Sequence, residues 1–309
     1  MKAIVVIKGD LPPLRIELAR PETSGLIVGN IDGLGPLKAD LSFTKLATMD
    51  GEVLNAARLN RRDILIPLVY ADSYPGFTDV NITRRKVMNY FEIKSTVTLI
   101  FEMLSGKKYQ ISGVVQSNDV PIFTKAQGSK ITVSCPNPYF IDTDTDGEIT
   151  HLYGVESMFE FPFSNESLTN NMIEFGDIVT EGIANIDYKG DSTPGLLFKL
   201  YFTGEVHNID IYNLTTKQQI TIDTSRLAKV TGRKIGPGDV IELSTINEIR
   251  KRYAKLIRDG KEYNIIGCLD KFPQWIHLQG GDNKIAVSAD TGIQYINMTT
   301  THNTLYGGV

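Results

Sequence analysis

The chain has 309 residues, of which 41% are hydrophobic and 22% charged, with a formal net charge of -4 and a pI near 5.7. This composition is that of an ordinary globular protein, long enough for two domains. The acidic balance argues against a dedicated nucleic-acid-binding protein, and no stretch reaches the roughly 20 apolar residues that a membrane-spanning helix needs.

The first part of the chain predicts short strands separated by turns. Residues 2–7 and 14–18 alternate between apolar and polar side chains or form a short apolar run, as strands do. A glycine-rich turn follows at 29–36, where several positions suit a positive φ. Residues 39–43 then alternate in the manner of a half-buried strand. We therefore expect a β domain at the N-terminal end.

The segments that follow extend this domain. Residues 64–70 form an apolar strand in which Pro67 cannot donate a ladder hydrogen bond, so we expect an edge strand or a bulge. Residues 79–90 are the one clear helix candidate, with an apolar stripe and basic residues facing outward. Residues 96–102 and 109–115 flank a Ser-Gly-Lys turn and predict a hairpin. A strand at 131–135 ends at two prolines.

The polar, acidic run after these prolines predicts a boundary between domains. We assign residues 1–138 to an N-terminal domain, 139–152 to a linker and 153–309 to a C-terminal domain. In the last of these, turn signals recur about every 8–12 residues, which is typical of a β-sandwich. Asp259-Gly260 is a two-residue hairpin signal. The predicted fold class is mainly β, with one short helix near 79–90.

Few residues are arranged for chemistry. Asp142-x-Asp144-x-Asp146-Gly147 begins like a calcium-binding loop, but Tyr153 stands where the bidentate glutamate belongs, which favours a solvated acidic linker. Trp275 is a candidate for stacking on a sugar ring or for packing in a core. We expect Cys135 and Cys268 to be buried thiols rather than a disulfide, because the N-terminal sequence shows no export signal. We predict no catalytic residue, no metal and no cofactor, and hence no enzyme.

Two basic clusters are candidate assembly-interface residues. Arg58, Arg61 and Arg62 lie in a polar stretch between two predicted strands, and Arg84 and Arg85 lie on the predicted helix. The functional interpretation is contact across a subunit interface or toward passing DNA. The alternative is a solvated surface, which is the common role of such clusters.

Several motifs, taken in order, resemble distal tail proteins, which are structural proteins of long-tailed bacteriophages. They are Asn30–Pro36, Ala47–Gly51, Asn55–Arg58, Cys135–Phe140, Phe161–Asn165 and Gly281–Asn283. The resemblance implies an N-terminal ring-forming β domain and a C-terminal galectin-like β-sandwich.

The same resemblance implies a function and partners. It implies a hexameric ring at the distal end of the tail tube, joining the tube to the tail-tip hub or baseplate and to host-recognition proteins. The implied partners are copies of the chain, the tail tube protein, a hub or fibre protein and a receptor-binding protein. DNA would only pass through the lumen, no membrane would be bound, and the virion tail tip would assemble in the host bacterial cytoplasm.

Two other functions remain open on the sequence. One is a carbohydrate-binding module or glycosidase that acts on bacterial cell-wall sugars, for which Trp275 is the candidate platform. The other is an adhesin that touches the host directly.

Overall fold

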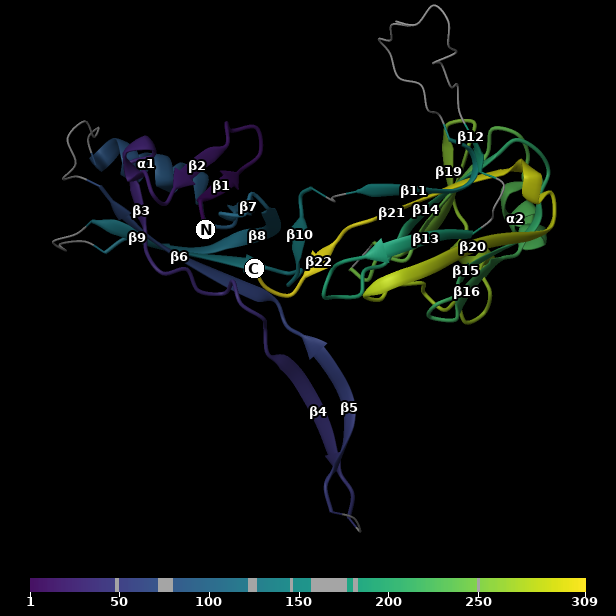
Figure 1. The fold of residues 1–309 in the computed structure, drawn as a ribbon, viewed down its shortest axis with the longest axis horizontal. Coiled ribbons are helices and arrows are strands. Elements are labelled where there is room, and N and C mark those ends of the chain that lie inside the picture. Colours follow the sequence, from purple (N-terminus) through teal and green to yellow (C-terminus); the bar gives the residue numbers. More distant parts are fainter. Residues whose placement is uncertain are drawn as a thin grey trace, which may run out of the picture. The chain divides into compact units, whose positions relative to one another are not determined.

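The computed structural model divides the chain into two compact units (Figure 1). Unit 1 comprises Met1–Asp144 together with Leu305–Val309, and unit 2 comprises Thr145–Thr304. The residues that the structure describes are 1–47, 50–71, 80–121, 127–144, 147–156, 177–179, 183–248 and 251–309. The predicted linker, 139–152, contains a strand of unit 1 and the beginning of a strand of unit 2. The return of Leu305–Val309 to unit 1 was not anticipated by the sequence, and we call these residues the return segment.

Unit 1 is built on one antiparallel sheet whose main path runs β2-β1-β7-β8-β9-β6-β3. The short strands β10 and β22 pair with each other, and β10 also pairs with β8. The bounds are β1 Ala3–Ile7, β2 Leu14–Glu17, β3 Leu26–Val28, β6 Arg62–Tyr70, β7 Thr96–Glu102, β8 Lys108–Asp119, β9 Gly128–Cys135, β10 Phe140–Asp142 and β22 Leu305–Tyr306.

One face of this sheet packs against a helix, and together they form the core of unit 1. Helix α1 spans Val80–Tyr90, within the range where the sequence predicts a helix, and it buries Thr83, Val87 and Tyr90. The core of unit 1 combines α1 with alternate residues of the sheet, such as Ile64 and Leu99. A short 3-10 helix, η1 Pro21–Thr23, precedes β3.

The expectation that the strand with Pro67 lies at an edge is wrong, because β6 is paired on both sides, with β9 and β3. Strand β3 ends at Val28, opposite Leu68, and the amide of the next residue, Gly29, donates to the Pro67 carbonyl oxygen at 2.8 Å. In an antiparallel pair of this kind, an N–H at position 67 would donate back to the carbonyl oxygen of Gly29. Proline lacks that N–H, so the sheet loses this one bond at the point where β3 ends.

Unit 2 is a β-sandwich of a seven-stranded and a four-stranded sheet, in the orders β12-β11-β21-β14-β17-β18-β19 and β13-β20-β15-β16. The bounds are β11 Glu148–Glu156, β12 Asp177–Val179, β13 Ile183–Tyr188, β14 Leu197–Phe202, β15 His207–Asn213, β16 Gln218–Ile222, β17 Val240–Ser244, β18 Tyr253–Arg258, β19 Lys261–Asn264, β20 Gly281–Thr291 and β21 Ile296–His302. Residues from both sheets, such as Phe198 and Ile211, share one core. The mainly β fold class is confirmed.

Short helical segments connect the strands of unit 2. Helix α2 spans Thr224–Thr231, and two 3-10 helices are η2 Ile266–Cys268 and η3 Ile293–Tyr295. The Asp259-Gly260 turn joins β18 to β19 as predicted, with both residues at positive φ (50° and 73°).

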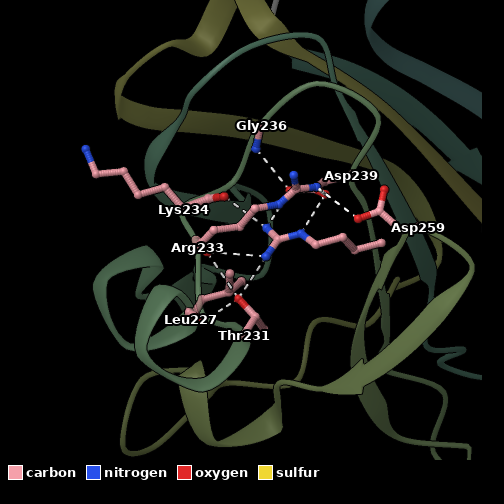
Figure 2. A network of polar contacts seen from close by, with 8 residues as sticks. Leu227, Thr231, Arg233, Lys234, Gly236, Asp239 and Asp259 are labelled. Atoms are coloured by element: carbon pink, nitrogen blue, oxygen red, sulfur yellow. Dashed lines mark hydrogen bonds and ion pairs between the residues drawn. The ribbon is translucent and has the colours of Figure 1, made fainter.

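A buried ion pair ties the loop after α2 to the sandwich (Figure 2). Arg258 donates to both carboxylate oxygens of Asp239, at 2.8 and 2.6 Å, and both side chains are almost fully buried. The amide of Gly236 also donates to Asp239, and Arg258 donates further to the carbonyl oxygen of Lys234. These bonds satisfy the buried charges and hold the loop in one conformation.

Candidate functional site

The feature of unit 1 with the clearest bearing on function is a two-stranded hairpin, which we call the arm. Its strands are β4 Ala39–Lys45 and β5 Glu52–Leu59, and they form a sheet of their own (Figure 1). Every residue of β4, and every residue of β5 except the half-buried Leu59, is exposed. The sequence predicts a half-buried strand at 39–43, and this is wrong for the chain alone, because these residues are exposed and none of the other described elements covers them.

The register of the arm separates apolar from polar side chains. Cross-strand partners share a face, and successive residues of a strand alternate between faces. The pairs Ala39↔Leu59, Leu41↔Ala57 and Phe43↔Leu54 therefore form one apolar face. Leu41, Phe43 and Leu54 are 47%, 49% and 52% exposed. We call this set of six residues the apolar face of the arm.

The opposite face of the arm is mostly polar. Asp40 pairs with Arg58 across the strands at 3.5 Å, and the Asn55 amide donates to the Thr44 hydroxyl at 2.6 Å. A β-bulge after Ser42 accommodates the extra residue in β5. The arm is therefore amphipathic, yet neither face is packed against another element in the part of the chain that the structure describes. This pattern is typical of a surface that another molecule covers.

The predicted basic residues lie in different environments. Arg58 is on the polar face of the arm, and Arg61 is exposed at its base and pairs with Asp63 at 3.4 Å. Arg84 is half-buried and Arg85 exposed on α1. These four residues stay candidates for an interface, although Arg58 lies on the opposite face from the apolar side chains.

Arg62 differs from the other four arginines and is not a surface residue. It is only 1% exposed, and its guanidinium is hydrogen-bonded inside unit 1. It donates hydrogen bonds of 2.5 to 2.7 Å to the carbonyl oxygens of Gly33, Gly35, Pro138 and Gly307. Burial lowers the pKa of this guanidinium from its usual value. A residue held in this way is not available to a partner.

The ring of Phe140 completes the surroundings of Arg62, with the guanidinium carbon 4.6 Å from its centroid. A signal for this burial was present in the sequence. Arg62 is in phase, at every second residue, with Ile64, Ile66 and Leu68, all of which face the core. The alternation of the strand thus predicts that Arg62 faces inward, although its place next to the exposed Arg61 suggests a surface position.

The described residues among the candidates for metal binding and for sugar stacking do not form such sites in the structure. The buried carboxylate of Asp142 accepts the amide of Asp144 at 3.1 Å, and Asp146 lies outside the described residues. Within the described ranges, no group of three His, Cys, Asp or Glu side chains is arranged to hold a metal ion. Trp275 is half-buried against the core of unit 2, and the Arg252 guanidinium lies over its ring at 5.3 Å, so the ring face is already occupied.

The thiols of Cys135 and Cys268 are both buried, and burial keeps them in the protonated, less reactive form. Burial raises the pKa of Cys135 to about 12 and raises that of Cys268 as well. In the part of the chain that the structure describes, no helix is long and apolar enough to cross a membrane.

Comparison with known proteins shows which solved structures share this fold. Neither a protein-family model nor a curated protein sequence matches the chain. Among solved structures, the Dit protein of phage SPP1, described as a paradigm of the hub adsorption apparatus in phages that infect Gram-positive bacteria, aligns with a TM-score of 0.59 at 10% identity, over 98% of this chain and 99% of that one. The phage P2 baseplate in its activated conformation with calcium aligns at a TM-score of 0.44, 9% identity and 98% coverage of both chains. The chain has the fold of the SPP1 Dit protein, which confirms the resemblance indicated by the sequence motifs at the level of the fold.

Proposed function

We propose that this chain is a non-enzymatic structural protein of a bacteriophage tail, which forms a hexameric ring at the distal end of the tail tube. The ring joins the tube to the tail-tip hub or baseplate. The observation that carries the proposal is the arm, whose apolar face is exposed and is not covered by any other described element of its own chain. The fold of the SPP1 Dit hub protein supports the tail assignment.

The arm needs a partner on energetic grounds. An isolated two-stranded hairpin is at best marginally stable in water. Completing the burial of Leu41, Phe43 and Leu54, each about half-exposed, contributes roughly 1 kcal/mol per side chain. Each copy in a ring gains this contribution through its own arm. We take the cover to be a second copy of the chain.

In the proposed ring, each copy gives its arm to the next copy and receives an arm from the previous one. The contact between two copies is then not reciprocal, and it is therefore heterologous. Heterologous contacts propagate head to tail, and they close into a ring when the rotation between copies allows it. Closure also removes the exposed arm from solvent in every copy.

The two units take separate roles in this proposal. Unit 1, with the arm, is the ring-forming domain, and unit 2 is a galectin-like sandwich that offers binding surface to other tail proteins. The partners are the tail tube protein, a hub or fibre protein and a receptor-binding protein, while DNA only passes through the lumen. The protein is located at the virion tail tip, after assembly in the host bacterial cytoplasm.

Electron microscopy of the purified protein tests this function. We expect closed, hollow rings in negative stain, either for the chain alone or after addition of the tube and hub proteins. A double variant, Leu41→Asp with Phe43→Asp, places two charges on the apolar face of the arm and should abolish the rings.

The matched control is Ser42→Asp with Thr44→Asp, which adds the same charges to the polar face and should leave the rings intact. A wild-type chain that stays monomeric with both partners supplied would contradict the proposal. Rings that survive charges on the apolar face would contradict the role of the arm.

A further inference from the structure

The arm is held at its base by parts of unit 1 that are far apart in the sequence. Gly33 and Gly35, whose carbonyl oxygens bind Arg62, immediately precede the arm, and Arg62 itself follows it. A third acceptor is the carbonyl oxygen of Gly307, from the return segment. One guanidinium therefore joins the segment entering the arm, the segment leaving it and the return segment.

The return segment also packs directly on the residues that enter the arm. The Val309 amide donates to the carbonyl oxygen of Leu34 at 3.0 Å. A Cβ on Gly308 would lie 3.0 Å from the backbone nitrogen of Pro36, so a side chain there would press on the loop and displace it by a few tenths of an ångström. Tyr306 pairs with Phe140 across β22 and β10. The loop 33–36 is thus bonded to β6 through Arg62 and to the return segment.

Arg62 depends on this shell being complete. All four of its hydrogen-bond acceptors are neutral carbonyl oxygens, so the buried charge is compensated by their number and geometry. Removal of the return segment takes away the Gly307 acceptor and opens a path for water to the guanidinium. The contacts of Arg62 to Gly33 and Gly35 then compete with hydration, and the base of the arm loses its fixed conformation.

We propose that docking of the return segment sets the arm in position, with Arg62 as the positioning residue. The return segment follows unit 2 in the chain, so it leaves the ribosome only after unit 2 has been synthesised. The base of the arm is therefore completed last. If the proposed function holds, this order delays ring formation until both units of a copy exist.

Hydrogen exchange measured by mass spectrometry tests the proposal independently of ring formation. All chains carry the Leu41→Asp and Phe43→Asp changes, so that none assembles. The full chain is compared with a chain ending at Thr304 and with Gly308→Val, which crowds the return segment against Pro36. Gly280→Val is the matched control, because a Cβ there meets nothing within 4 Å.

The reporters are the amides of Asp32 and Leu65, which bond each other's carbonyl oxygens at 3.1 Å across the base of the arm. We expect both to exchange about tenfold faster or more in the truncated chain and in Gly308→Val. The paired strands at Leu99 and Ile111, in the same unit, should keep their protection. Arg62→Lys keeps the charge but not the fork of donors, and should give the same local increase.

Unchanged exchange at Asp32 and Leu65 in the truncated chain would overturn the proposal. An equal increase at Leu99 and Ile111 would also overturn it, because the return segment would then only stabilise unit 1 as a whole. These readings do not depend on assembly. A wild-type chain that forms no rings counts against the proposed function and leaves the positioning of the arm standing.

Discussion

The Asp239–Arg258 pair shows how a single buried ion pair fixes a loop. Both charges are removed from water, and each is matched by the other and by nearby backbone groups (Figure 2). The carboxylate loses hydration by burial, but the hydrogen bonds from Arg258 and Gly236 outweigh this and lower the pKa of Asp239. The pair therefore contributes to stability only while Asp239 is ionised.

Arg258→Met should lower the free energy of unfolding of the protein by about 3–5 kcal/mol, because the Asp239 carboxylate stays buried and loses both hydrogen bonds from the guanidinium that matches its charge. Denaturant unfolding followed by circular dichroism measures the change. Arg233→Met is the control, since that side chain is half-exposed and contacts Asp239 at 3.3 Å; it should cost about 1 kcal/mol or less. Equal losses for the two variants would refute this assignment.

The pH dependence of this pair follows from the direction of the shift. Because the folded-state pKa of Asp239 lies below its unfolded value, the unfolded chain binds the proton first as the pH falls. The stability from this group is present above the unfolded pKa and is lost as the pH drops through the folded one. The difference between wild type and Arg258→Met should therefore shrink in acid, below about pH 4.

The thiols give an opposite dependence. The pKa of Cys135 is raised to about 12 by burial, so the unfolded thiol ionises first as the pH rises. The contribution of Cys135 is fully present below its unfolded pKa and is lost as the pH approaches 12. Iodoacetamide at pH 8 should label neither Cys135 nor Cys268 in the folded protein, and both in denaturant. Labelling of either native thiol at the denatured rate would show that it is exposed.

At the residue scale, Arg62 marks the limit of what the sequence predicts. Charged residues are usually exposed, and Arg58 and Arg61 follow that rule while Arg62 does not. The strand period indicates its inward direction, but its acceptors lie up to 245 residues away in the sequence. No local pattern identifies a shell assembled from such distant carbonyl groups.

Among the elements, α2 is the one whose ends are most fully specified by its sequence. The Asp223 side chain accepts the amides of Ser225 and Arg226 at 2.9 and 3.0 Å, and Gly232 ends the helix at φ 80°. An N-cap of this kind satisfies backbone donors that the first turn leaves unpaired, and glycine adopts the left-handed conformation without strain.

Asp223→Ala should therefore lower the free energy of unfolding by about 1 kcal/mol, through loss of the N-cap. Thermal unfolding measured by calorimetry gives the difference. Asp223→Asn keeps an accepting oxygen and should recover most of the stability, even though it removes the ion pair with Arg226. Equal destabilisation by both changes would assign the effect to that ion pair instead.

Local elements are well predicted where the signal is itself local. The hairpin β7–β8 and the Asp259-Gly260 turn follow from residues that are adjacent in the chain. The sequence places Pro67 at an edge, which is wrong, because nothing local to β6 shows that β3 pairs beside it up to Leu68. The arm is intermediate: alternation at 39–43 predicts its apolar face, but not that this face is exposed in the described structure.

For the whole molecule, two separate cores define the two units, and each is made of its own sheets. The motif order in the sequence indicates the same fold as the SPP1 Dit structure, although only 10% of the residues are identical. A fold of this kind depends on strand positions and turns, which tolerate wide substitution. The return segment could not be predicted, because five residues carry no pattern that names their partner.

The central claim is that the apolar face of the arm binds another copy of this chain. Photo-cross-linking tests it most directly, with benzoylphenylalanine placed at Phe43 and, as the control, at Thr44 on the other face. We predict a ladder of covalent oligomers from position 43, with the attachment mapped to unit 1 of a second copy, and far less from position 44. Adducts confined to the same chain, or equal ladders from both positions, would contradict the account.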